Sequence, residues 1–160
     1  MNQTIVNQFS DDIALCQHAK KLDEFANKLQ FLLFTYKIPE PLENIGLRIE
    51  GDGTPHGLQA TAHGFAFHGR FEHVWLKQKG TRDLGGRVQF FRENIDGKDS
   101  GEVIYQLLFN RQGLVKLAGE QFFSYTLLGN EDDTQHLCRS LALALTRAIH
   151  SQLDVIDLDN

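Results

Sequence analysis

The chain has 160 residues, of which 41% are hydrophobic and 23% charged, and its formal net charge at pH 7 is −5. This composition is typical of a globular domain and excludes a largely disordered chain. The modest negative charge argues against bulk affinity for nucleic acid or for a membrane surface. A single domain over residues 1–160 is expected, in which 1–9 and 154–160 are the segments most prone to fraying.

The N-terminal part of the chain predicts one long helix. Ser10 is a suitable N-cap, and Asp11 and Asp12 would lie in the first turn, where acidic side chains are favourable. Apolar residues then recur at helical spacing and form one stripe: Leu15, Leu22, Ala26, Leu29, Leu33 and Tyr36. Pro39 and Pro41 follow and are expected to end the helix.

The middle of the chain, residues 44–128, alternates aromatic and polar residues between glycine turns, which is typical of strands with one dry face. Strands are expected at 45–50, 58–77, 87–94, 102–110, 114–117 and 121–128. Residues 58–77 would span about 66 Å as one strand. We therefore favour a break at His68-Gly69; one bent strand with a glycine bulge is the alternative. Short connections favour an antiparallel meander of six or seven strands.

A second helix is predicted from about 130–133 to about residue 153, since its acidic start is well capped. Its buried stripe is expected to consist of Leu137, Cys138, Leu141, Leu145, Ala148 and Ile149. The fold class is therefore α+β: an N-terminal helix, the meander, and a C-terminal helix packed on one sheet face, with both helices covering the same face.

Two cysteines, Cys16 and Cys138, each fall on or beside a predicted apolar stripe. Buried free thiols in a reducing compartment are the favoured interpretation, and a disulfide between the two helices is the alternative. The first ten residues carry no signal pattern, and the longest apolar runs are too short to cross a bilayer. A cytoplasmic location without membrane association is expected.

Four of the seven histidines lie close together in the sequence: His56, His63, His68 and His73. Imidazole is a common metal ligand, so one hypothesis is a metal ion or haem held through His63, His68 or His73. A separation of five residues along a strand reverses the face, however, and no carboxylate follows at the spacing of a zinc site. Surface or edge-strand histidines, with no cofactor or metal, are the preferred interpretation.

Residues 76–87 form a basic, glycine-containing segment that is predicted to be a loop. Its N–H groups could hold a phosphate or carboxylate, aided by nearby cations: Arg70, Lys77, Lys79, Arg82 and Arg87. The segment matches neither a Walker-type phosphate loop nor a dinucleotide fingerprint, and a solvated hairpin loop is the simpler interpretation. Over residues 70–92, basic residues alternate with aromatic residues, a pattern that proteins also use to bind single-stranded nucleic acid. The negative net charge argues against such a partner.

Three functions are compatible with this pattern, and an enzyme is the least favoured class because no serine lies in a nucleophile-elbow context. The first is a non-catalytic binding or adaptor protein that acts through an exposed aromatic sheet face and forms a homodimer. The second is a pocket between sheet and helices for an apolar, anionic or haem-like small molecule, with His63, His73 and Trp75 as candidate pocket or interface residues. The third is single-stranded nucleic-acid binding by residues 70–92. The acidic and apolar residues 153–160 could also dock on a partner.

Overall fold

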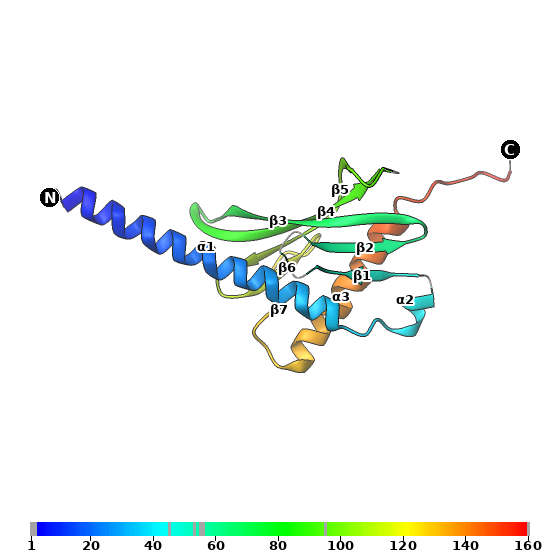
Figure 1. Ribbon diagram of the computed structural model, residues 1–160, viewed down its shortest axis with the longest axis horizontal. Helices are drawn as coiled ribbons and strands as arrows, with labels where there is room; N and C mark the ends of the chain where they lie inside the picture. The colour runs from blue at the N-terminus through cyan, green and yellow to red at the C-terminus, as the bar shows by residue number, and fades with distance from the viewer. Residues whose placement is uncertain (1–2, 45, 53, 55–56, 95, 160) are drawn as a thin grey trace.

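The computed structural model describes residues 3–44, 46–52, 54, 57–94 and 96–159. Its elements in chain order are α1 (Gln3–Thr35), α2 (Glu40–Asn44), β1 (Arg48–Glu50), β2 (Leu58–Ala62), β3 (Phe65–Gln78), β4 (Thr81–Glu93), β5 (Asp99–Asn110), β6 (Leu114–Leu117), β7 (Tyr125–Thr126) and α3 (Glu131–His150). The seven strands of the described segments form one curled antiparallel sheet, in which neighbours in space are neighbours in the chain (Figure 1). The predicted α+β meander between two helices is confirmed.

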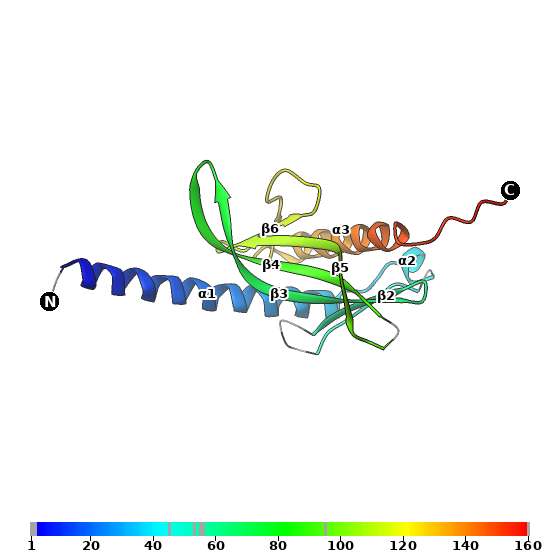
Figure 2. The same ribbon diagram turned by 90° about the horizontal axis from the view of Figure 1, so that it is seen from above.

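Both long helices pack on the same face of the sheet (Figures 1 and 2). Helix α1 contacts β1, β3 and β4, α3 contacts β5 and β7, and the two helices also contact each other. Side chains from the sheet and from both helices form one hydrophobic core. Its largest fully buried rings come from the three long strands: Phe67, Phe90 and Phe109. The core therefore consists of a layer of strand aromatics beneath the leucines of α1 and α3.

The rings of the central strands pack at close range. The ring centroids of Phe71 on β3 and Phe109 on β5 are 5.6 Å apart, with an interplanar angle of 13°. The strand between them supplies glycine at this point, and a Cβ atom on Gly86 would lie 2.3 Å from Cζ of Phe109. Glycine is thus required at this position of β4 because the Phe109 ring occupies the space of a side chain.

The chain does break between residues 58 and 77, but at His63-Gly64 and not at His68-Gly69. Both turn residues adopt positive φ, 52° at His63 and 77° at Gly64, as a two-residue hairpin turn requires. Gly69 lies inside β3, opposite Leu58 of β2. The turn at 63–64 leaves Phe67, Gly69 and Phe71 on the core face, which a turn at 68–69 would divide.

Two other strand predictions differ from the structure. Residues 76–87 are not a loop, because β3 and β4 continue to a two-residue turn at Lys79 (φ 50°) and Gly80 (φ 79°). The expected strand 121–128 is reduced to Tyr125–Thr126, and residues 118–124 connect it to β6. The strand predicted at 114–117 is confirmed.

Helix α1 begins by Gln3, so Ser10 lies inside the helix and is not its N-cap. No proline or glycine precedes Ser10, so nothing in the local sequence prevents the helix from starting earlier. The helix ends at Thr35, before Pro39, as expected. The short helix α2 was not predicted; Pro41 occupies its first turn, where the missing N–H group is tolerated.

Helix α3 starts where the sequence predicts. The Asn130 side chain accepts a hydrogen bond from the Asp133 N–H (2.9 Å), and the Asp133 carboxylate accepts one from the Asn130 N–H (3.1 Å), which completes a capping box. The helix ends at His150, three residues before the expected end, with Ser151 as C-cap. Residues 154–159 have no helix or strand, and the docking expected for this segment stays a prediction.

The buried rings should dominate the stability of the fold. Replacement of Phe109 by alanine leaves a cavity beneath the helices, and we expect it to lower the free energy of unfolding by about 3–5 kcal/mol. Phe122→Ala is the matched control because that ring is largely exposed, and it should change stability by less than about 0.5 kcal/mol. Urea denaturation followed by circular dichroism measures both. Equal effects of the two variants would contradict the assigned core.

Candidate functional site

One hollow at the surface combines exposed aromatic side chains with cations. It lies between the projecting β3–β4 hairpin and the residues that connect β6 to β7. We call it the hairpin groove. Its volume is about 550 Å³, and it is lined by Trp75, Leu76, Lys77, Gln78, Leu108, Lys116, Gln121, Phe122 and Phe123. Figure 2 shows the end of the hairpin and the β6–β7 connection rising on the same side of the sheet.

Two structural features shape this groove. The β3–β4 pairing is continuous from Phe67↔Arg92 to Gln78↔Thr81, so the hairpin extends well past the part of the sheet that the helices cover. On the other wall, Tyr125 donates a hydrogen bond from its hydroxyl group to Oε1 of Glu120 (2.8 Å), which holds the 118–124 connection in place. Burial raises the pKa of Tyr125, so the hydroxyl stays protonated and able to donate.

The lining of the groove is apolar and positively charged. Trp75 is 49% exposed and Phe122 66% exposed, which is unusual for rings of this size. Lys77 and Lys116 add two ammonium groups, and none of the described residues that line the groove is acidic. The Arg82 guanidinium lies over the Trp75 ring, 4.8 Å from its centroid, and orients the indole by a cation–π contact. These side chains could bind apolar groups and a carboxylate or phosphate together.

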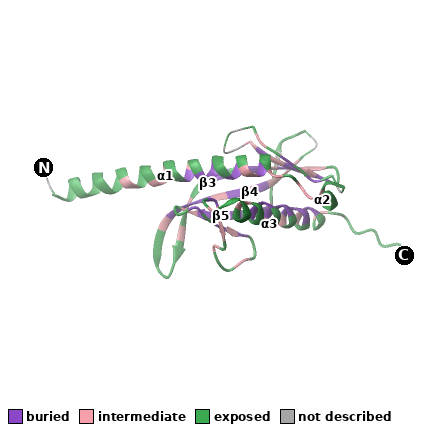
Figure 3. Ribbon diagram, turned by 90° about the horizontal axis from the view of Figure 1, so that it is seen from below, coloured by how far each residue is buried: buried purple, intermediate pink, exposed green. Residues whose placement is uncertain are grey.

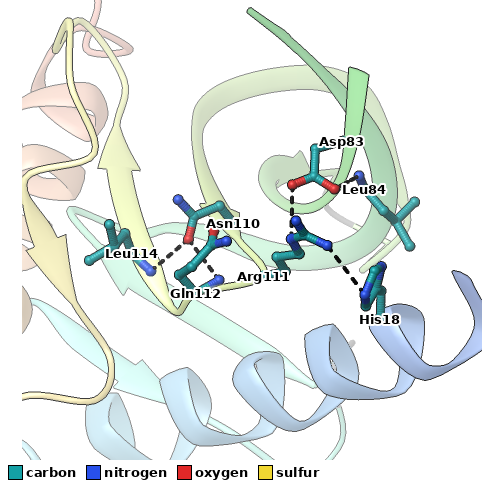
Figure 4. A network of polar contacts seen from close by, with 7 residues as sticks. All are labelled: His18, Asp83, Leu84, Asn110, Arg111, Gln112 and Leu114. Carbon is teal, nitrogen blue, oxygen red and sulfur yellow. Dashed lines mark hydrogen bonds and ion pairs between the residues drawn. The ribbon is translucent and has the colours of Figure 1, made fainter. Parts of the chain in front are cut away.

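A polar network ties the hairpin to the rest of the fold (Figure 4). Arg111, in the turn after β5, forms an ion pair from Nε to Asp83 of β4 (3.1 Å) and contacts Nε2 of His18 on α1 (3.3 Å). The arginine guanidinium has only hydrogen-bond donors, so Nε2 of His18 accepts this hydrogen bond. Asp83 also accepts a hydrogen bond from the Leu84 N–H (3.0 Å). One guanidinium thus joins α1, β4 and the β5–β6 turn at the base of the hairpin.

Of the five cations predicted to bind an anion, only Lys77 lines the groove. Lys79 and Arg82 lie at or beside the hairpin turn. The other two lie farther along the sheet, where Arg70 packs on the Phe91 ring (4.9 Å) and Arg87 forms an ion pair with Glu72. Residues 70 and 77 are separated by about 23 Å on an extended strand. The five cations are therefore spread along β3 and β4, and anion binding by any of them stays a prediction.

The candidate histidines also lie apart from one another. His73 donates from Nε2 towards Asp23 (2.9 Å) and the Ala19 carbonyl (3.2 Å), and so holds α1 against β3. His68 lies 3.6 Å from Glu93. His63 contacts His150, the last residue of α3, through their Nε2 atoms (3.1 Å). His56 lies outside the described residues.

Consequently, His63, His68 and His73 have separate partners and do not come together in one cluster. Among the described residues, no group of three or more histidine, cysteine, aspartate or glutamate side chains could hold a metal ion. The buried residues between sheet and helices form one hydrophobic core, and a small-molecule pocket there stays a prediction. Of the three pocket or interface candidates, Trp75 lines the hairpin groove.

The aromatic side chains expected on an exposed sheet face are largely in the core. Phe67, Phe71, Phe90, Tyr105 and Phe109 are all buried. The residues that alternate with them on the strands, and so occupy the opposite face, are mainly polar: Arg70, Glu72, Arg87, Gln89 and Gln106. Phe91 also lies on this polar face and is half-buried. Of the aromatic residues in the described strands, Trp75 is the one that is highly exposed.

A second surface, on α1, was missed by the sequence analysis. The first half of α1 extends past the sheet and is exposed on all sides (Figure 3). Its apolar side chains include Phe9 and Ile13, and farther along the same helix Phe31 and Phe34 are exposed as well. The helical spacing of these residues was visible in the sequence. It was overlooked because the stripe through Leu22 and Leu33 already accounted for an amphipathic helix.

The two cysteines are free, but only one is buried. Cys138 lies in the core, as predicted, whereas Cys16 is exposed on the projecting part of α1. The prediction for Cys16 was wrong because α1 continues past the sheet, so no element covers that turn of the helix. Burial raises the pKa of the Cys138 thiol to about 11, which leaves little reactive thiolate near neutral pH.

Comparison with protein-family models, with curated proteins and with solved structures found no match for this chain. Over the described residues, no helix is both long enough and apolar enough to span a bilayer.

The different environments of the two thiols can be measured. In the folded protein at pH 8, a thiol reagent such as DTNB should label Cys16 and leave Cys138 unmodified, because the pKa of Cys138 is about 11 and its sulfur is buried. Unfolding in guanidinium should release the second thiol. The Cys16→Ser variant provides the control, since it should show no labelling until it unfolds. Rapid labelling of folded Cys16→Ser would contradict the buried position of Cys138.

Proposed function

We propose that this protein is a non-catalytic binding or adaptor protein that takes an acidic, apolar segment of a partner protein in the hairpin groove. The observation that carries the proposal is the lining of the groove, where exposed Trp75 and Phe122 lie beside Lys77 and Lys116, with no acidic residue among the described lining residues. Aromatic rings supply large contact areas at low entropic cost, and lysines favour a segment that carries carboxylates.

The shape of the molecule supports a protein partner in particular. The groove lies between a protruding hairpin and the connection that follows β6, so an extended segment can enter from the side (Figure 2). The Arg111 network and the Tyr125–Glu120 hydrogen bond hold the base and one wall of the groove. A groove formed in advance lowers the entropic cost of binding. The cytoplasm is the expected location, because an exposed free thiol such as Cys16 suits a reducing compartment.

A second candidate function is the binding of a small amphipathic anion in the same groove. Its volume of about 550 Å³ falls in the usual range of small-molecule sites. In that case Trp75 and Phe122 would contact the apolar part of the ligand, and Lys77 and Lys116 its anionic end. Both candidate functions use the same residues of the groove. Only a comparison of the ligands that bind, a peptide or a small molecule, can distinguish the two functions.

Trp75 is the sole tryptophan of the chain, so its fluorescence reports directly on the groove. The probe is a synthetic peptide, Leu-Asp-Val-Ile-Asp-Leu-Asp, which copies the acidic apolar residues 153–159. We expect its binding to shift the Trp75 emission to shorter wavelength, since the indole leaves water. The analogue with asparagine at each aspartate should bind more weakly, because it cannot pair with the lysines.

The double variant Lys77→Ala/Lys116→Ala should weaken binding of the acidic peptide by about 2- to 30-fold, since each of the two exposed ion pairs contributes roughly 0.2–1 kcal/mol. Lys98→Ala removes an exposed lysine outside the groove and is the matched control. A response to laurate together with none to either peptide would favour the small-molecule function. If neither ligand changes the Trp75 emission at millimolar concentration, the groove is not the binding site.

A further inference from the structure

The outer side of α1 carries a continuous pattern of its own. Three of its phenylalanines are highly exposed: Phe9 (66%), Phe31 (63%) and Phe34 (64%). At about 100° of turn per residue, the large apolar side chains on this side fall within about 60° of one another, opposite the core residue Leu22: Phe9, Ile13, Phe31 and Phe34. Their exposure shows that no described side chain of the sheet covers them, and the buried residues of α1 lie on the opposite side of the helix.

This outer stripe has two apolar ends and a charged centre. The N-terminal end is a hollow bordered by Phe9, Ile13 and Cys16. The C-terminal end is a hollow bordered by Asn27, Phe31 and Phe34, together with Gly51 after β1. Lys20 and Glu24 lie between the two ends on the same side of the helix and are exposed.

We propose that two copies of this chain associate through this stripe, with their α1 helices antiparallel and a twofold axis near residue 22. The spacing carries the inference. Ile13 lies nine residues before Leu22 and Phe31 nine residues after it, so each Ile13 faces the Phe31 of the second copy. To within one residue of this register, Phe9 also meets Phe34, and Cys16 meets Asn27.

The charges agree with the same register. Lys20 lies two residues before Leu22 and Glu24 two residues after it. An antiparallel pair therefore brings each lysine opposite the glutamate of the other copy, twice by symmetry. A parallel pair would place Lys20 against Lys20 and Glu24 against Glu24, which is unfavourable. A twofold interface must be self-complementary, and this stripe is complementary to its own reverse in both apolar contacts and charge.

The length of the stripe is sufficient for a stable interface. From Phe9 to Phe34 the helix runs about 38 Å at 1.5 Å per residue. The exposed parts of six phenylalanines, three from each copy, supply on the order of 750 Å² of apolar surface. Ile13, Cys16 and the polar centre add to this area, which brings the total into the range of specific interfaces, about 1,200–2,000 Å².

Pairing would also account for the projecting half of α1. Residues 3–17 lie past the sheet, and apart from the partly buried Ala14 they are exposed. A helical segment of about 15 residues is only marginally stable in water without packing. In the antiparallel pair this half of α1 packs against the body-bound half of the partner helix. The inference is independent of the hairpin groove, which lies on other elements.

The register can be tested by cross-linking through Cys16. We expect Asn27→Cys to give a covalent dimer on mild oxidation, with a disulfide from each introduced thiol to Cys16 of the other copy. The wild-type protein should not cross-link, because its two Cys16 residues would lie about 17 Å apart along the helices, beyond the reach of a disulfide. The double variant Asn27→Cys/Cys16→Ser should stay monomeric in denaturing gels. Cross-linking of the wild type through Cys16 would indicate a parallel pair and overturn the proposal.

The interface itself is tested by sedimentation at about 100 μM. The wild type should sediment as a dimer, and Phe9→Glu should sediment as a monomer with an unchanged Trp75 spectrum, since Phe9 lies outside the core. Phe122→Glu, which places the same charge on an exposed ring of the groove, should remain dimeric. Lys20→Glu should weaken the dimer about tenfold or more, and Lys20→Glu/Glu24→Lys should restore it. A monomeric wild type, or a charge exchange that restores nothing, would overturn the proposal.

Discussion

The structure depends on the burial of one aromatic face of a long meander. Phe67, Phe90 and Phe109 are removed from water altogether, and this is possible because α1 and α3 lie on the same side of the sheet. A one-residue slip of any central strand would turn its rings to the polar face. The buried ring layer therefore sets the strand register. The register in turn decides where each hairpin turn lies and which side chains remain exposed.

The exposed surfaces arise because several elements are longer than the core they share. Strands β3 and β4 continue past the helices, so Trp75 is carried out of the core face into an open groove. Helix α1 in turn continues past the sheet, so Phe9 and Ile13 have no cover from their own chain. In the hairpin groove and on the outer side of α1, apolar side chains are exposed to water next to charged side chains. Such surfaces are typical of interaction sites.

The charged residues have two distinct roles. Arg111 joins α1 to the sheet through His18 and Asp83, and His73 joins them through Asp23; these contacts position the two surfaces. Arg87 is occupied by Glu72, so it contributes little free charge to its surroundings. Lys77 and Lys116, by contrast, face the groove without an acidic neighbour among its described lining residues. Basic residues that look alike in the sequence thus differ in function, because only the fold decides which of them meet a carboxylate of the chain.

Local patterns in the sequence were sufficient for the fold class, the antiparallel meander, the β6 strand and the capped start of α3, because each depends on residues within a few positions of one another. Tertiary structure alone decided the rest. His63-Gly64 and His68-Gly69 are equivalent dipeptides, and the choice between them depends on which turn keeps Phe67 and Phe71 on one face. The groove likewise required Trp75 and Phe122, distant in sequence, to meet, and the exposure of Cys16 required knowing where the sheet ends. These are contacts between remote segments, and their free energy depends on packing that no local pattern encodes.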